Sequence, residues 1–221
     1  MLTPFGSRTF RRLILRAAMV TAGAALSCGA GFAADDVSLD FHEKDGHVNV
    51  AGSFLVEADP QVAWDVLSDY DHIPEFVGNM KISHIQIREG NDVLVHQVAE
   101  GGFLFFTQKI RLFLHIIETP NRTIDFKDMA HKDFKTYNGS WQIDPQAGGK
   151  ELKITYQLEA ELNFSAPAFL ADDAMGGGAK DLLKSVRQQI LLRQARANIL
   201  HPSSLTMTQA PQTTPDAVSL R

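Results

Sequence analysis

The segment at residues 152–162 places the strictest limit on how this chain can fold. Apolar and polar side chains alternate along its whole length, and the apolar ones are Leu152, Ile154, Tyr156, Leu158, Ala160 and Leu162. Such alternation is typical of a β-strand that has one buried face and one solvated face. A sheet built from strands of this kind must bury its apolar face against another element.

Most of the chain before residue 163 follows the same plan. The stretch 48–56 also alternates, with one face of a strand formed by Val48, Val50, Gly52, Phe54 and Val56. Five more strands are expected between turns rich in Gly, Asn, Asp and Pro, at residues 81–88, 93–100, 104–118, 124–126 and 137–143. Short turns join antiparallel neighbours, so these strands predict one antiparallel sheet.

Two kinds of helix are expected beside the sheet. Asp59 is a suitable N-cap and Pro60 suits the first turn of a short helix, and residues 71–76 form a second helical turn. A long helical segment begins near residue 165 and reaches about Asn198. It is the only expected element long enough to cover the sheet, so the order of elements is that of an α+β fold.

Two local motifs resemble the START-like superfamily. The first is Val-Glu-Ala-Asp-Pro-Gln-Val-Ala-Trp-Asp-Val-Leu-Ser-Asp-Tyr-Asp at residues 56–71, followed by Ile-Pro-Glu-Phe-Val at residues 73–77. The second is Gly-Ser-Trp-Gln-Ile at residues 139–143. They are similar to motifs of polyketide cyclase/dehydrase and coenzyme Q-binding START-domain proteins. The resemblance implies a helix-grip fold, in which a curved antiparallel sheet of about seven strands wraps around a long C-terminal helix, with two short helices after the first strand.

That fold implies a tunnel between the sheet and the long helix that holds a hydrophobic small molecule. Its candidate ligand-binding residues are Phe54, Leu112, Leu114, Phe126, Tyr137, Trp141, Tyr156, Leu158, Phe169, Met175, Leu183 and Val186. Tyr137, Trp141 and Tyr156 are the most informative, because each carries a polar group that a dry core would have to satisfy. The structural alternative is that these side chains simply fill a core.

Three consecutive glycines, Gly176, Gly177 and Gly178, interrupt the long helical pattern. Each glycine costs about 1 kcal/mol relative to alanine inside a helix. One interpretation is a hinge that lets the start of the helix, with Phe169 and Met175, move as the lip of the tunnel. The other is a loop that separates two helices. The segment lacks the spacing of a phosphate-binding loop, so nucleotide binding is not expected.

The first 33 residues have the layout of a secretory signal peptide. Four arginines between residues 8 and 16 precede an apolar stretch, and Gly31-Phe32-Ala33 provides small residues for cleavage. Twin-arginine export through Arg11-Arg12 and lipid attachment at Cys28 are alternatives to general secretion, and an uncleaved N-terminal anchor is the alternative to a signal peptide. The mature protein is then expected in the periplasm or outside the cell. Residues 34–46 read as a polar lead-in, 47–200 as a START-like ligand-binding domain, and 201–221 as a disordered tail.

Cleavage after Ala33 would leave 17 basic and 26 acidic residues, a net charge of −9. Such a surface argues against nucleic acid and against anionic membranes, although transient membrane contact stays open. Cleavage also removes the only cysteine, and no histidine pair has metal-ligand spacing. The sequence therefore predicts no metal site and no cofactor, and it contains no recognisable catalytic motif.

Three functions fit these observations. The first is an exported carrier of a hydrophobic small molecule, such as a lipid, quinone, hopanoid or polyketide. The second is a polyketide-type cyclase or dehydratase, which needs a polar side chain at proton-transfer distance from the substrate. The third is a non-catalytic interaction module of the cell envelope, in which side chains fill the tunnel.

Overall fold

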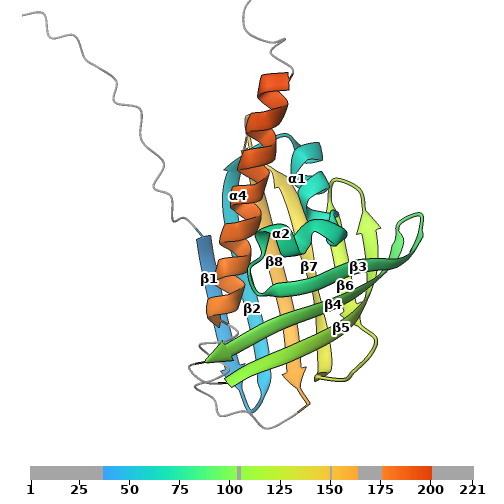
Figure 1. Ribbon diagram of the computed structural model, residues 1–221. Coiled ribbons are helices and arrows are strands. Elements are labelled where there is room, and N and C mark those ends of the chain that lie inside the picture. Colours follow the sequence, from blue (N-terminus) through green and yellow to red (C-terminus); the bar gives the residue numbers. More distant parts are fainter. Residues whose placement is uncertain (1–36, 104–105, 150, 164–175, 201–221) are drawn as a thin grey trace, which may run out of the picture. The chain divides into compact units, whose positions relative to one another are not determined.

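The computed structural model describes residues 37–103, 106–149, 151–163 and 176–200 (Figure 1). Within these residues one sheet of eight antiparallel strands has the order β1-β2-β8-β7-β6-β5-β4-β3. The strands are β1 (Val37–Lys44), β2 (His47–Glu57), β3 (Met80–Glu89), β4 (Asp92–Phe103), β5 (Phe106–Thr119), β6 (Thr123–Asp128), β7 (Phe134–Pro145) and β8 (Glu151–Leu162).

The described helices are α1 (Pro60–Leu67), the 3-10 turn η1 (Tyr70–His72), α2 (Ile73–Phe76) and the long α4 (Gly177–Leu200). Figure 1 shows α4, α1 and α2 on the same side of the sheet, with β3, β4 and β5 curving around below them. This arrangement confirms the predicted α+β helix-grip fold. None of the described helices combines the length and hydropathy that crossing a membrane requires.

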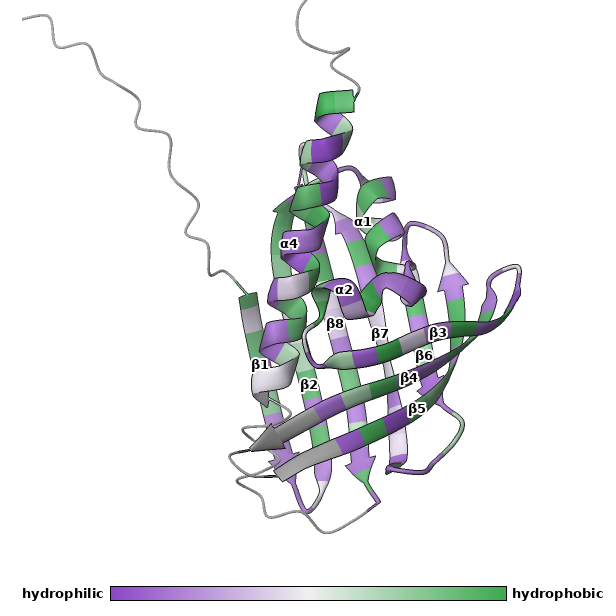
Figure 2. Cartoon of the chain, viewed as in Figure 1, coloured by the Kyte–Doolittle hydropathy of each residue, from purple (hydrophilic) through white to green (hydrophobic). Residues whose placement is uncertain are grey.

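The alternation in β8 and β2 has the predicted consequence. Leu152, Ile154, Tyr156 and Leu158 are buried on the inner face, whereas Lys153 and Gln157 between them are exposed. Figure 2 shows the same alternation as green and purple bands along these strands. The helices therefore pack against the apolar face of the sheet.

The polar lead-in expected at residues 34–46 is instead largely an edge strand, β1. Three apolar side chains, Val37, Leu39 and Phe41, alternate there with polar ones and pack against the core. The exposed polar side chains between them made the segment read as a connection. Edge strands with one solvated face tolerate this composition, and the sheet gains an eighth strand.

The short helix begins as predicted. The Asp59 side chain accepts a hydrogen bond of 2.8 Å from the Gln61 backbone amide, and Pro60 occupies the first turn. Trp64 on the opposite face of α1 is buried in the core. The capped helix is thereby packed against the core of the protein.

Side chains on two faces of α4 hold it in place. Leu183, Val186 and Ile190 are buried in the core. On the neighbouring face, Arg187 Nε donates to the Leu55 carbonyl and Arg193 donates to the Asp65 carbonyl, both at 3.0 Å. These contacts fasten α4 to β2 and α1, as the resemblance implies for the long helix.

Candidate functional site

A cavity of about 110 Å³ lies between the sheet and the helices. Small-molecule pockets have volumes of roughly 300–1,000 Å³, so the expected open tunnel is a narrow cavity in this structure. An engineered cavity of about 150 Å³ holds benzene, so this one accommodates at most a single small ring. A larger ligand requires wall side chains to move.

The cavity wall combines apolar side chains from nearly every element. It is formed by Val66, Leu67, Tyr70, Ile73, Phe76, Val77, Met80, Gln97, Leu114, Ile116, Ile124, Phe126, Tyr137, Trp141, Tyr156, Leu182 and Val186. Ile73 and Phe76 of α2 and Leu182 of α4 are only half-buried. Solvent therefore reaches the wall at α2 and α4, as it does at the half-buried Met80, Tyr137 and Trp141.

The structure brings half of the candidate ligand-binding residues to this wall. They are Leu114, Phe126, Tyr137, Trp141, Tyr156 and Val186. The other described candidates are buried in the core away from the wall, and they are Phe54, Leu112, Leu158 and Leu183. Phe169 and Met175 lie outside the described residues.

Sequence reasoning missed the contribution of η1, α2 and β4. Tyr70, Ile73 and Phe76 belong to the motif at residues 56–77 that resembles the START-like superfamily. They lie in two short helical turns, whose sequence pattern does not indicate which way the side chains point. Gln97 was missed because it is a polar residue with its side chain on the inner face of β4. Leu182 could have been found, since it lies four residues before Val186 on the same face of a helix.

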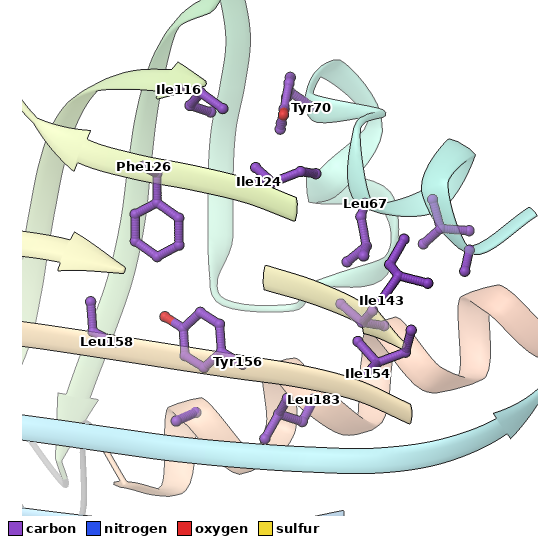
Figure 3. Packing of buried hydrophobic residues seen from close by; sticks show 14 of the residues in the cluster. Leu67, Tyr70, Ile116, Ile124, Phe126, Ile143, Ile154, Tyr156, Leu158 and Leu183 are labelled. Atoms are coloured by element: carbon purple, nitrogen blue, oxygen red, sulfur yellow. The ribbon is translucent and has the colours of Figure 1, made fainter. Parts of the chain in front are cut away.

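Aromatic rings form one side of the cavity. The centroid of Tyr156 lies 4.6 Å from that of Trp141 and 6.2 Å from that of Phe126. Phe126 lies 5.9 Å from Tyr137. Figure 3 shows Phe126 and Tyr156 reaching from β6 and β8 into the space beneath the helices. Ring pairs at these separations stabilise the wall by about 0.5–1.5 kcal/mol each, so this side of the cavity is preformed.

Two tyrosine hydroxyls meet within this aromatic wall. The side chains of Tyr137 and Tyr156 hydrogen-bond to each other. Burial raises the pKa of Tyr137 to about 12, and burial together with the Tyr137 oxygen also raises the pKa of Tyr156. Both hydroxyls therefore stay neutral, and they offer a ligand hydrogen bonds without charge.

We expect Tyr156→Phe to lower the free energy of unfolding by about 1 kcal/mol, since it removes one hydrogen-bond partner while the half-buried Tyr137 hydroxyl can turn toward the cavity. Tyr137→Phe is expected to cost more, about 1–3 kcal/mol, because it leaves the buried Tyr156 hydroxyl without a partner. Urea unfolding of both variants measures the difference. The opposite order would mean that the Tyr156 hydroxyl finds another partner.

A buried carboxylate supports Tyr70, which belongs to the cavity wall. Glu118 accepts hydrogen bonds of 2.8 Å from the Tyr70 hydroxyl and from Arg88. The Arg88 guanidinium also lies 5.7 Å from the centre of the Tyr70 ring. Tyr70 is therefore held by its ring and by its hydroxyl, which fixes this part of the wall.

The η1–α2 segment that covers the cavity is held by two aspartates. The Asp71 carboxylate accepts hydrogen bonds from His84, at 2.9 Å, and from the Ile85 amide, at 2.8 Å. Asp69 pairs with His72 at 2.6 Å and also with Arg193 of α4. The cover of the cavity is thus tied to β3 on one side and to α4 on the other.

The Asp69–His72 ion pair shifts the pKa of both side chains. The hydrogen bond and charge of Asp69 raise the pKa of His72. Burial opposes ionisation of Asp69, but hydrogen bonds from His72 and Arg193 lower its pKa overall. The contribution of His72 to folding stability is fully present below its ordinary pKa of about 6.5. It is lost as the pH rises through the raised pKa of the folded state. The contribution of Asp69 to folding stability is fully present above its ordinary pKa near 3.9. It is lost as the pH falls through the lowered pKa of the folded state.

We therefore expect the thermal midpoint of the wild type to fall slightly between about pH 6 and pH 8, relative to that of His72→Gln. The effect is small because His72 is exposed to solvent. His42→Gln is the matched control, since the described structure gives His42 no ion pair. Parallel pH profiles for wild type and His72→Gln would show that the pair adds nothing to folding.

The histidines on the sheet do not form a metal site in the described part of the chain. His84 lies directly opposite His96 on β4, while His115 pairs with Asp92 at 2.9 Å. Among the described residues no group of three potential ligands has the geometry to hold a metal ion.

The glycine triplet lies at the start of α4. Gly177 and Gly178 belong to its first turn, and neither has a positive φ. A tight turn through these two residues is therefore excluded. The segment before Gly176 lies outside the described residues, so the hinge and the loop between helices both remain predictions.

Comparison with known proteins agrees with this geometry. The family model for polyketide cyclase/dehydrase and lipid transport proteins matches residues 56–187, which is more than half of the chain. No curated protein matches significantly.

Several solved structures share the fold. A START superfamily protein from Mycobacterium smegmatis aligns with a TM-score of 0.56 and 16% identity, over 66% of this chain and 99% of that one. A STAR-related lipid transfer protein from Xanthomonas axonopodis gives a TM-score of 0.56 and 15% identity, over 71% and 99%. The Zhui aromatase/cyclase from Streptomyces sp. R1128 gives 0.57 and 10%, over 66% and 95%. Identities this low establish a common fold and nothing finer.

Proposed function

Because the chain belongs to the polyketide cyclase/dehydrase and lipid transport family, we propose that it binds a hydrophobic small molecule in the cavity beneath α2 and α4. The observation that carries this proposal is the composition of the wall. It is apolar except for a few converging polar groups, among them Gln97 and the hydroxyls of Tyr137 and Tyr156. A ligand pocket combines these same two features.

The position of Gln97 supports the proposal further. The side chain is 7% exposed, and its Nε2 donates to Ser83 Oγ at 3.1 Å. The amide oxygen is then available to accept a hydrogen bond inside the cavity. The tyrosine hydroxyls lie on the other side of the same space. An apolar ligand with a carbonyl or hydroxyl group would match this set.

The size of the cavity requires the ligand to widen it. Phe76 and Leu182 are half-buried and belong to two helices, α2 and α4, that make little contact with each other. The aromatic rings on the sheet side are locked against one another. We infer that α2 and α4 part to admit the ligand while the sheet stays fixed.

The same wall favours binding over catalysis. Tyrosines are the only titratable residues among those that form it, and burial raises the pKa of Tyr137 to about 12. A general base works best with a pKa near the operating pH, so these hydroxyls suit hydrogen bonding better than proton abstraction. The carrier function is accordingly preferred to that of a cyclase or dehydratase.

The ligand is proposed only as a class. Lipid, quinone, hopanoid and polyketide-like molecules all present an apolar body with one or two polar groups. The names of the similar structures span both lipid transfer and aromatase/cyclase activity, so both kinds of molecule belong to this class.

We also propose that the chain is exported and that the signal peptide is removed near Ala33. The basic start, the apolar stretch and Gly31-Phe32-Ala33 support this. The intact mass of the protein in the envelope fraction tests it. A chain that keeps residues 1–33 and stays in the cytoplasm would overturn the proposal, and a lipid-sized addition at Cys28 would assign a lipoprotein.

Native mass spectrometry of the purified protein, followed by organic extraction, tests the binding proposal. The wild type should carry an apolar molecule, and Leu182→Trp, which places a large ring at the cavity wall, should lose it. Leu192→Trp is the matched control, because Leu192 is 47% exposed on the same helix and does not contact the cavity.

A wild type that carries no ligand and takes up no added lipid or quinone would favour the interaction module. Loss of water from the bound molecule, seen as a lower ligand mass after incubation, would favour the dehydratase or cyclase.

A further inference from the structure

Among the described side chains that form the cavity wall, Gln97 alone has an oxygen that accepts hydrogen bonds and cannot donate one. The tyrosine hydroxyls of the wall also carry a hydrogen, and the indole nitrogen of Trp141 only donates. A ligand that fills the cavity therefore decides whether the Gln97 oxygen has a hydrogen-bond partner.

Gln97 is buried between apolar side chains and one serine. Val95 shares its face of β4, and Leu112 lies opposite on β5. Ser83, which is also buried, lies opposite Gln97 on β3, and its hydroxyl accepts the hydrogen bond of 3.1 Å from Gln97 Nε2. This bond fixes the plane of the amide and turns its oxygen away from Ser83.

The Gln97 oxygen faces the cavity without a partner. Within the described part of the chain, the bond to Ser83 is the single hydrogen bond of the Gln97 side chain. Asn121 Oδ1 is the one unpaired side-chain oxygen or nitrogen there that protein atoms enclose completely, so the Gln97 oxygen is still accessible at the cavity that its side chain lines. Buried polar groups are nearly always paired, and an apolar group that covered this oxygen would leave it unpaired at a cost in affinity.

The tyrosine pair belongs to the other end of the cavity. Tyr137 and Tyr156 lie on β7 and β8, and both β5 and β6 separate β7 from β4. Adjacent strands lie about 4.7–4.9 Å apart, and three such intervals lie between Gln97 and Tyr137 along the sheet. A single small ring therefore meets one polar end of the cavity at a time.

We propose that Gln97 determines the chemical class of the ligand, which places a hydroxyl group at the β4 end of the cavity. A hydroxyl donates to the Gln97 oxygen, whereas a ketone, an ester or an ether has no hydrogen to donate. The inference rests on the proposed binding function and narrows it. Alcohols and ketones of the same size are no longer equivalent ligands at this end.

Three single-ring probes of similar size test the proposal, and they are cyclohexanol, cyclohexanone and methylcyclohexane. The full chain is freed of bound lipid on a hydrophobic resin, and each probe is titrated while the backbone amide signals are followed by NMR. Cyclohexanol should bind at least about tenfold more tightly than cyclohexanone, with the largest shifts near Ser83 and Gln97, because only the alcohol pairs the Gln97 oxygen. Equal affinity, or tighter binding of the ketone, would overturn the proposal.

Matched variants assign the preference to Gln97. Gln97→Leu alone leaves the buried Ser83 hydroxyl unpaired, so it is combined with Ser83→Ala, which replaces both partners by apolar groups. The ratio of the two affinities should fall to about threefold or less in this double variant. Gln157→Leu makes the same change at an exposed position on the other face of the sheet and should keep the wild-type ratio. An unchanged ratio in the double variant would refute the role of Gln97.

Methylcyclohexane separates this inference from the binding proposal. It has no polar group, so it reports on the cavity alone, and the double variant should bind it at least as tightly as the wild type. Binding of methylcyclohexane together with equal affinities for the alcohol and the ketone would reject the role of Gln97 and leave the binding function standing. Failure of all three rings to bind would reject both.

Discussion

Leu183→Ala is expected to lower the free energy of unfolding by about 2–5 kcal/mol, the largest loss foreseen for any single residue of α4. Leu183 is fully buried, and its Cδ1 occupies the place where the Cβ of a side chain on Gly52 would begin. The leucine therefore fills a hole that β2 leaves by having a glycine on its inner face. Removing the side chain leaves that hole empty, because the backbone of a paired strand cannot collapse into it.

A double-mutant cycle with Gly52→Ala tests this packing directly. Gly52→Ala alone should cost about 1–3 kcal/mol, because the new methyl collides with Leu183. Combined with Leu183→Ala it should cost less, since the methyl then enters vacant space. Relief is partial, because Leu39 Cδ1 and the Ser38 carbonyl lie 3.2 and 3.3 Å from the same position. Urea unfolding of the four proteins measures the coupling.

Leu192→Ala serves as the control for the cycle. Leu192 is 47% exposed on α4, so its truncation should change stability by about 0.5 kcal/mol or less. Additive effects of Gly52→Ala and Leu183→Ala would mean that the two residues do not share one space. The packing of α4 on the sheet would then depend on contacts other than the one between Gly52 and Leu183.

Gly52 illustrates what could be predicted from the sequence and what could not. Its place on the inner face of β2 follows from period-two alternation, as do the inner faces of β8 and most of β7. The residue that fills the space above it does not follow, because the pairing of Gly52 with Leu183 depends on how α4 is rotated and shifted along the sheet. The alternation of apolar and polar residues determines which face of the sheet a side chain occupies, whereas the packing of the helix on the sheet determines which residues it contacts.

The cavity also has one property that the sequence pattern predicts and one that depends on packing. Five predicted strand side chains reach its wall because inner-face positions of neighbouring strands must converge there, and Val186 of α4 is the sixth predicted residue in the wall. Its small volume depends on how rings such as Phe126 and Tyr156 pack together, which no pattern encodes.

Replacing Gly177 and Gly178 together by alanine is the second change with a large expected effect. Both residues lie in the first turn of α4, with nothing within 4 Å of the new methyl at Gly177 and only Asn79 Nδ2, at 3.7 Å, near that at Gly178. Alanine is favoured by about 1 kcal/mol per position in a helix, so the free energy of unfolding should rise by up to about 2 kcal/mol. Thermal and urea unfolding measure the gain.

Gly90→Ala is the matched control, because Gly90 lies in the turn between β3 and β4 with a φ of +61°, a conformation that alanine rarely adopts. It should gain no comparable stability. A loss of stability in the Gly177→Ala, Gly178→Ala variant would contradict the helical conformation of the two glycines.

The same variant decides whether the glycines act as a hinge. If ligand exchange requires the first turn of α4 to unwind, stabilising that turn by about 2 kcal/mol reduces the open population about thirtyfold. Ligand release, followed by transfer of a fluorescent fatty acid to vesicles, should then slow by a similar factor while the affinity of the closed form is unchanged. Higher stability with unchanged release would reject the hinge, and it would assign the opening of the cavity to α2 alone, with its ties through Asp69 and Asp71 as the next residues to test.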